Sequence, residues 1–151
     1  MLDIKKTYEI ADALVAGIES LNIDIKKRGT AESAVSPHDS LNRLYQSPDI
    51  ILSHDLEERI NFANSAALWF FGRNIIGQPS INLVPDIKDL REKRAEAFRK
   101  VIETGIHEPF EKSPRFKDGG ELAFVTGYAF RYRIDGAYSI GALITDFSTS
   151  K

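Results

Sequence analysis

The segment ELAFVTGYAFRYRI, residues 121–134, constrains the fold most, because it is a long β-rich run with a tight-turn signal at each end. Asp118-Gly119-Gly120 precedes it and Asp135-Gly136 follows it, and Asp-Gly pairs favour short hairpin turns. A second β-rich run, AYSIGALITDFS, follows the second turn, and a strand-like piece within residues 107–117 precedes the first. Strands joined by short turns pair antiparallel. The last third of the chain therefore predicts three neighbouring antiparallel strands.

Earlier segments predict two more strands and a helical insert. DIILSHD and RINFAN are short β-rich runs separated by LEE, which indicates a hairpin. Three helical or irregular segments follow, at residues 65–72, 74–86 and 89–105. Strand pairs on either side of a helical insert favour an antiparallel α+β sheet over a repeated βαβ unit.

An apolar stripe predicts an amphipathic helix near the N-terminus. Its members recur at spacings of three and four residues: Ile10, Leu14, Ile18, Leu21 and Ile25. The stripe packs either on the domain's own core or on a second copy of the chain, and the sequence leaves both open. A polar connector follows Gly29, and Ser36-Pro37 predicts the start of a short second helix. We expect this helix and connector at residues 1–35, and a single domain at residues 36–151.

Composition excludes several classes of protein. Hydrophobic residues make up 42% of the chain and charged residues 28%, as in soluble globular domains. The formal net charge of −2 gives no general attraction to nucleic acid or to anionic lipid. The absence of Cys removes disulfides, thiolate nucleophiles and thiolate metal sites. Acidic residues interrupt the apolar part of the N-terminus, so it does not resemble a signal peptide. We expect a cytoplasmic protein with no nucleic-acid or membrane partner.

Several motifs, in this order, resemble a PAS domain. ILSHD and INFAN are similar to its first two strands, and NSAALWFFG resembles the passage N-x-A-x-x-x-x-x-G into its first helix. FKDGG is similar to the turn between the third and fourth strands, and IDGAYSIGALITDFS resembles the closing hairpin. The likeness runs from about Asp49 to Ser148. It implies a PAS-like five-stranded antiparallel sheet with helices on one face, preceded here by the N-terminal amphipathic helix.

Within this superfamily the sequence is most similar to the MEKHLA group. The motifs LSHD, NxAAL, Pro-Ser followed by Pro, and a helix ending in Gly occur in that group in the same order. Here they stand at Leu52–Asp55, Asn64–Leu68, Pro79–Pro85 and Val101–Gly105. GYAFRYR, at residues 127–133, departs from the Trp-containing fourth strand of that group.

The resemblance implies a stand-alone sensory or signalling module that binds a small molecule or a protein partner, and that is not an enzyme. The cofactor stays unknown. Photoactive types that need a Cys are excluded, and residues 89–105 hold no His to bind a haem. We expect any output to pass through a signalling partner or through a homodimer formed by the N-terminal helix.

The three His residues give little support for catalysis. We predict structural roles for His38 and His107. His54 is followed by Asp55, but neighbouring residues of a strand point to opposite faces, which argues against a catalytic dyad.

Aromatic side chains mark a candidate ligand site. Alternation along residues 124–132 places Phe124, Thr126, Tyr128 and Phe130 on one face, together with Tyr132. The predicted ligand-binding residues are Asn64, Trp69, Phe98, Phe124, Thr126, Tyr128 and Phe130. The alternatives are that the aromatic residues fill the core, and that Asn64 caps the helix after it or holds the strand end.

Two further features of the same strand have open roles. Gly127 lies in mid-strand, which predicts a bulge or a close approach by another group. Arg131 and Arg133 either meet a carboxylate ligand or lie at a solvated sheet edge.

An alternative function is a small cone-shaped enzyme similar to ketosteroid isomerase. It would use Asp55 or Asp146 as a base, and Tyr128 or Tyr132 as a hydrogen-bond donor. The helical insert between the second and third strands favours the PAS interpretation. No nucleophile–base or phosphate-binding motif is visible in the sequence.

Overall fold

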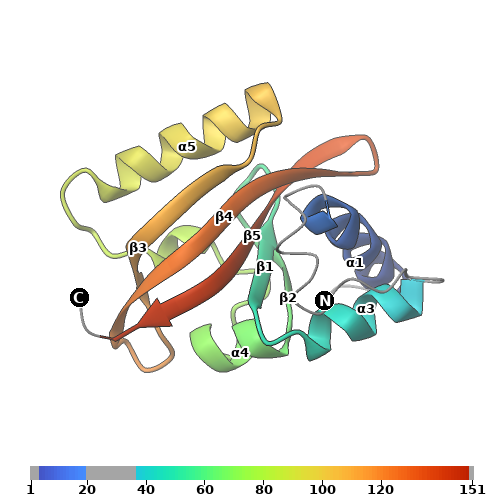
Figure 1. The fold of residues 1–151 in the computed structure, drawn as a ribbon, viewed down its shortest axis with the longest axis horizontal. Helices are drawn as coiled ribbons and strands as arrows, with labels where there is room; N and C mark the ends of the chain where they lie inside the picture. The colour runs from blue at the N-terminus through green and yellow to red at the C-terminus, as the bar shows by residue number, and fades with distance from the viewer. Residues whose placement is uncertain (1–3, 20–36, 150–151) are drawn as a thin grey trace.

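The computed structural model describes residues 4–19 and 37–149 (Figure 1). The helices are α1 (Ile4–Glu19), α3 (Pro37–Gln46), α4 (Ser65–Phe71), the 3₁₀ helix η1 (Ser80–Leu83) and α5 (Leu90–Thr104). The strands are β1 (Ile50–His54), β2 (Ile60–Ala63), β3 (Glu108–Phe116), β4 (Leu122–Ile134) and β5 (Ala137–Ser148). Within this described part, none of the helices has the length and hydropathy needed to span a membrane.

The five strands form one antiparallel sheet in the order β2-β1-β5-β4-β3. The β3–β4 and β4–β5 hairpins close at the two Asp-Gly turns, and β5 returns to the middle of the sheet to pair with β1. The predicted fold class is therefore confirmed. Its helical insert, α4 to α5, joins the two groups of strands.

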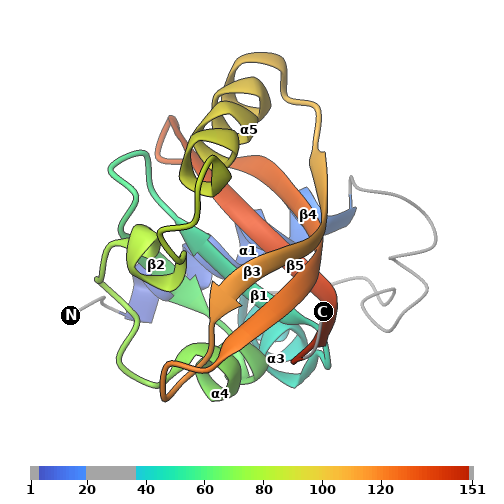
Figure 2. The same cartoon turned by 90° about the vertical axis from the view of Figure 1, so that its left-hand side faces the viewer.

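Helices cover both faces of the sheet. Figure 1 shows α5 on one side and α1 with α3 on the other, and in Figure 2 the strands lie between α5 and α3. Ile10, Leu14 and Ile18 of α1 are almost completely buried against the domain's own sheet. These residues of the apolar stripe therefore pack on the domain's own core, which is the first of the two alternatives given above. Leu21, Ile25, Gly29 and Ser36 lie outside the described residues.

Bulges interrupt the pairing of three strand pairs. One lies between Ser53 and His54 of β1, a second between Phe110 and Ser113 of β3, and a third beside Gly127, where β4 meets β5. A Cβ added to Gly127 would lie 2.0 Å from the carbonyl oxygen of Leu143. The prediction of a bulge or close approach at Gly127 is therefore confirmed.

Asn64 joins three segments through its side-chain amide. Its Oδ1 accepts hydrogen bonds from the backbone N–H of Ile51 (3.1 Å) and of Ala67 (3.0 Å). Its Nδ2 donates to the carbonyl oxygens of Leu44 (2.7 Å) and Asp49 (2.9 Å). The side chain thus caps α4 and also holds the end of β1, so both structural roles predicted for Asn64 are confirmed.

Candidate functional site

A small chamber lies between the sheet and the helices α4, η1 and α5. Its volume is about 70 Å³. Its polar lining residues are His54, Ser80, Arg94 and Arg115. Its apolar lining residues are Leu52, Phe71, Leu83, Val84, Phe98, Phe110, Val125, Ala129, Ile140, Ala142 and Ile144. We call this space the inner chamber.

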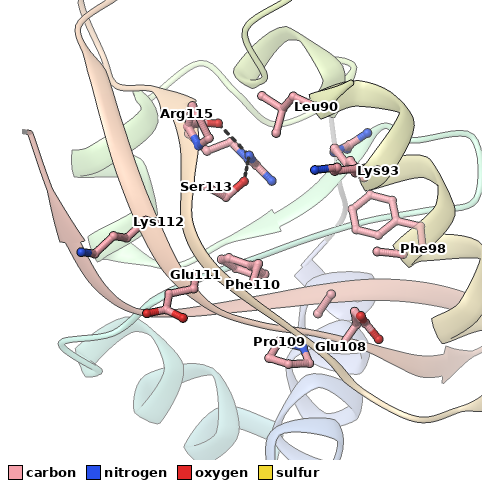
Figure 3. A pocket seen from close by; sticks show the side chains of 14 residues that line it. Leu90, Lys93, Phe98, Glu108, Pro109, Phe110, Glu111, Lys112, Ser113 and Arg115 are labelled. Carbon is pink, nitrogen blue, oxygen red and sulfur yellow. Dashed lines mark hydrogen bonds between the residues drawn. The ribbon is translucent and has the colours of Figure 1, made fainter. Parts of the chain in front are cut away.

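A wider groove of about 380 Å³ lies between α5 and β3 (Figure 3). It shares five lining residues with the inner chamber: Arg94, Phe98, Phe110, Arg115 and Ala129. We call this space the outer groove. The two spaces are therefore neighbours that share these side chains as a common wall.

His54 is a buried polar residue of the inner chamber, as are Ser80 and Arg94. It follows Leu52 on the same face of β1, and it is only 6% exposed. Its Nδ1 lies 2.9 Å from the carbonyl oxygen of Asp55, which can only accept a hydrogen bond, so Nδ1 carries the proton. Its Nε2 is buried and has no hydrogen-bond partner among the described residues. His54 therefore presents a free acceptor.

The surroundings of His54 keep its imidazole neutral. Burial lowers the pKa of His54, and the positive charge of Arg94 lowers it further, while the hydrogen bond to the Asp55 carbonyl raises it. The ring of Phe98 packs against the imidazole with the ring centres 4.9 Å apart. The Asp55 carboxylate accepts hydrogen bonds from the backbone N–H groups of Glu57 and Arg59, so it serves the turn after β1.

Arg94 of α5 is buried and compensated. Its Nη1 donates to Oε1 of Glu58 at 2.7 Å, and its Nη2 donates to Oγ of Ser80 at 2.7 Å. Its guanidinium carbon lies 4.4 Å from the centre of the Phe98 ring, which is a cation–π distance. Burial lowers the pKa of Arg94, and the bond to Glu58 opposes that effect. Arg94 thereby ties α5 to η1 and to the turn between β1 and β2.

Arg115 of β3 is the second arginine that lines both the inner chamber and the outer groove. Its Nη1 donates to Oγ of Ser113 and to the carbonyl oxygen of Pro114, both at 2.7 Å. Burial lowers the pKa of Arg115 to about 10, and the charge of Arg94 contributes to the same shift. The two arginines therefore lie near enough to repel each other.

Three of the seven predicted ligand-binding residues lie on helices or at a helix cap, and only one of these three lines the cavity. Phe98 lines the inner chamber and the outer groove. Asn64 is fully buried, and its four hydrogen bonds to the backbone use every donor and acceptor of its amide. Trp69 is 66% exposed on the outside of α4, beside Phe147 and Lys117.

The other four predicted residues, which lie on β4, share the face opposite to the inner chamber. Phe130 is buried against α1, and Tyr128 packs at the edge of the same cluster. Thr126 accepts a hydrogen bond from the backbone N–H of Lys112 through Oγ1, and Phe124 is half-buried beyond it. The structure therefore does not bring these four residues together with Phe98 in one cavity.

Arg131 and Arg133 bind groups of the protein itself. Arg131 donates to the carbonyl oxygen of Ile102 at 2.7 Å, and both guanidinium groups lie over the ring of Tyr138. His107 packs edge-on against Tyr128. In residues 4–19 and 37–149, no group of three or more His, Asp or Glu residues could hold a metal ion.

Only a weak signal in the sequence points to the polar residues that line the inner chamber. His54 stands on an otherwise apolar strand face with Ile50 and Leu52, so its burial was open to prediction from alternation. Arg94 and Arg115 carried no such signal. Arg94 belongs to a helix rich in exposed charges, and the direction of Arg115 depends on the bulge in β3.

The strand order and the helical insert give this chain the fold of PAS domains, and solved PAS domains match it. One is from Colwellia psychrerythraea, with a TM-score of 0.60 and 17% identity over 73% of this chain and 94% of that chain. Another is from an HTR-like protein of Haloarcula marismortui, with a TM-score of 0.54 and 17% identity over 70% and 87%. At these identities the likeness shows the fold alone.

A third similar structure is described as a PAS domain in complex with ethanol, from a LuxR-family transcriptional regulator of Burkholderia thailandensis. Its TM-score is 0.51, with 15% identity over 68% of this chain and 92% of that chain. None of the curated proteins compared with the chain matches it.

The family follows from the sequence match. The MEKHLA domain model matches residues 23–130, more than half of the 151 residues. The chain belongs to the MEKHLA family, and both the PAS and the MEKHLA predictions are confirmed. The match ends at Phe130, inside the segment GYAFRYR where the sequence departs from the group.

Proposed function

We propose that this chain is a sensory module that binds a small molecule in the inner chamber and the outer groove. The observation that carries the proposal is the buried Nε2 of His54, which has no partner in the described structure. A buried acceptor without a partner costs about 1–3 kcal/mol. A hydrogen-bond donor of a ligand would satisfy this acceptor, and the apolar walls around it would hold the rest of the group.

The volumes favour a ligand of few atoms. Pockets for drug-sized ligands measure about 300–1,000 Å³. The outer groove, at about 380 Å³, falls in that range, whereas the inner chamber holds only about 70 Å³. A flavin ring system does not fit the inner chamber. The Burkholderia PAS domain, whose structure contains ethanol, provides a precedent for a very small ligand in this fold.

Native mass spectrometry of freshly purified protein, together with its absorption spectrum, tests the proposal. We expect a bound mass without visible absorption. Ala129, which lines both spaces and is 4% exposed, is replaced by Leu to fill the inner chamber. Ala129→Leu should lose the bound mass, whereas Ala137→Leu, at an exposed position at the start of β5, should keep it.

A screen of small metabolites by thermal shift completes the test when the protein purifies empty. Stabilisation of the wild type that Ala129→Leu abolishes supports the proposal. A bare polypeptide mass, together with no stabilisation by any metabolite, would refute it and would favour a protein-interaction role.

We propose that output passes through a signalling partner or a homodimer, with α1 as the contact. The apolar stripe of α1 is occupied by the domain's own sheet, so the contact would use its outward side, where Lys5, Asp12 and Ala16 are exposed. Removing the helix would uncover the core, so a surface change is the cleaner test. Sedimentation should show a dimer for the wild type and a monomer for Ala16→Arg. A monomeric wild type would rule out the homodimer.

We further propose a cytoplasmic, non-enzymatic protein without a nucleic-acid partner. Both candidate bases of the alternative enzyme already accept hydrogen bonds from nearby backbone, which supports this. The Asp55 carboxylate accepts from the backbone N–H groups of Glu57 and Arg59, and the Asp146 carboxylate accepts from the backbone N–H of Phe147. The formal net charge of −2 gives the chain no general electrostatic attraction to nucleic acid. Turnover of a ketosteroid that depended on either Asp would overturn this assignment.

A further inference from the structure

The β3 bulge determines that Arg115 faces the cavity. Phe110 pairs with Gly127, and Ser113 pairs with Val125, so the two residues between them stand opposite the single residue Thr126. Lys112, one of the two, has a left-handed backbone with φ of 49° and donates its N–H to Thr126 Oγ1. Without this extra residue, the alternation that begins at Phe110 would turn Arg115 to the opposite face. The bulge therefore places a cation in an apolar cavity.

The charge of Arg115 has no carboxylate partner in the described part of the chain. Its hydrogen bonds go to a hydroxyl and to a carbonyl oxygen, which are neutral acceptors. Arg94, by contrast, has Glu58. The guanidinium groups of Arg94 and Arg115, with the single carboxylate of Glu58, leave an excess positive charge where the inner chamber and the outer groove meet. Arg115 is half-buried and lines both spaces, so an anion in the outer groove would supply the charged partner that this guanidinium lacks.

The carboxylates of the outer groove lie at its other end. Figure 3 shows the Arg115 side chain at one end near Leu90, with Glu108 and Glu111 at the opposite end and Phe110 between them. Lys93 adds a positive charge on the α5 side of the groove. An anionic ligand is therefore repelled from one end and attracted to the other, which fixes its direction in the groove.

We propose that the cavity binds a short hydroxycarboxylate, whose carboxylate pairs with Arg115 and whose hydroxyl donates to Nε2 of His54 in the inner chamber. The inference rests on the proposed function and names the chemical class of its ligand. A guanidinium and a carboxylate form strong, directional hydrogen bonds, so a carboxylate is the anionic group that suits Arg115. The neutral His54 accepts at Nε2, which explains the donor, and the apolar lining explains the hydrocarbon between them.

Isothermal titration of the full chain with chemically matched probes tests the class. The probes are unbranched carboxylates of three to six carbons with a terminal hydroxyl, the same acids without the hydroxyl, and the corresponding neutral diols. We expect at least one hydroxy acid to bind about tenfold more tightly than the acid without the hydroxyl and than the diol, as one well-placed hydrogen bond or charge pair predicts.

Two variants assign the two ends of the ligand. Arg115→Met removes the charge and keeps an unbranched apolar side chain, and it should weaken binding of the hydroxy acid by about 10- to 100-fold. Arg115→Lys should recover part of that loss. His54→Phe should abolish the preference for the hydroxyl and leave the plain acid bound as in the wild type. Arg99→Met, on the exposed side of α5, serves as the matched control and should change nothing.

The outcomes separate this inference from the proposed function. If diols or inorganic phosphate bind as tightly as the hydroxy acids, or if Arg115→Met binds the acids like the wild type, the hydroxycarboxylate assignment is wrong. When a neutral molecule binds and Ala129→Leu expels it, the cavity is still a ligand site and only the chemical class fails. When no probe binds and no metabolite stabilises the protein, both proposals fail.

Discussion

Replacing Asn64 by Ala gives the largest stability loss that we expect from one polar side chain of this domain. The side chain is completely buried, and it makes four hydrogen bonds to backbone groups of α3, β1, α4 and the residue before β1. Each bond contributes about 1 kcal/mol net, and loss of the helix cap alone costs about 1 kcal/mol. Asn64→Ala should therefore lower the free energy of unfolding by about 4 kcal/mol.

Urea unfolding followed by circular dichroism measures this loss. Whole domains are stable by about 5–15 kcal/mol, so the variant should still fold. Its melting temperature should fall by about 8–16 °C, taking about 2–4 °C per kcal/mol for a chain of this size. Asn64→Ser keeps an acceptor for the N–H of Ala67 and should recover about 1 kcal/mol.

Asn82→Ala is the control, because Asn82 is exposed on η1. Exposed substitutions of this kind stay within about 0.5 kcal/mol. A loss below about 1 kcal/mol for Asn64→Ala would refute the reasoning, since it would mean that water replaces the four bonds without cost.

Three further predictions concern single positions. The lowered pKa of His54 means that the unfolded chain takes up this proton first, so wild-type stability should fall as the pH drops below 6.5 through the folded-state pKa. In urea unfolding at several pH values, the free energy of unfolding of His54→Gln should fall less than that of the wild type as the pH drops. The same pH dependence for both proteins would contradict this prediction. Gly127→Ala should cost about 1–3 kcal/mol, because its Cβ would meet the Leu143 carbonyl, whereas Gly136→Asn, in an open turn, should cost little; equal losses would show that the close approach relaxes. The single Trp69 should be quenched readily by acrylamide, and a shielded, blue-shifted emission would contradict its exposure.

The sequence predicted the sheet well, because the determinants of its strands are local. Asp-Gly turns fix hairpins within a few residues, and Asn64 caps a helix that starts next to it. Which residues share a face of β4 was also correctly inferred from alternation.

The location of the cavity could not be inferred in the same way. Alternation shows that Phe124 and Phe130 share a face, but both faces of this sheet are covered by helices, so hydrophobicity does not tell which one holds the chamber. The apolar stripe of α1 likewise predicts that the helix packs on an apolar surface, but it does not identify that surface. Arg115 lay beyond prediction because an extra residue in β3 reverses its side, and that bulge is made by Lys112 and not by a glycine.

Phe130 sits between two glycines from distant parts of the chain. A Cβ on Gly17 of α1 would lie 2.7 Å from the Phe130 ring, and a Cβ on Gly141 of β5 would lie 2.5 Å from it. Substitutions at these three positions therefore depend on one another during evolution. A relative with Ala at either glycine position should carry a smaller residue where this chain has Phe130, and the three positions should change together within the family.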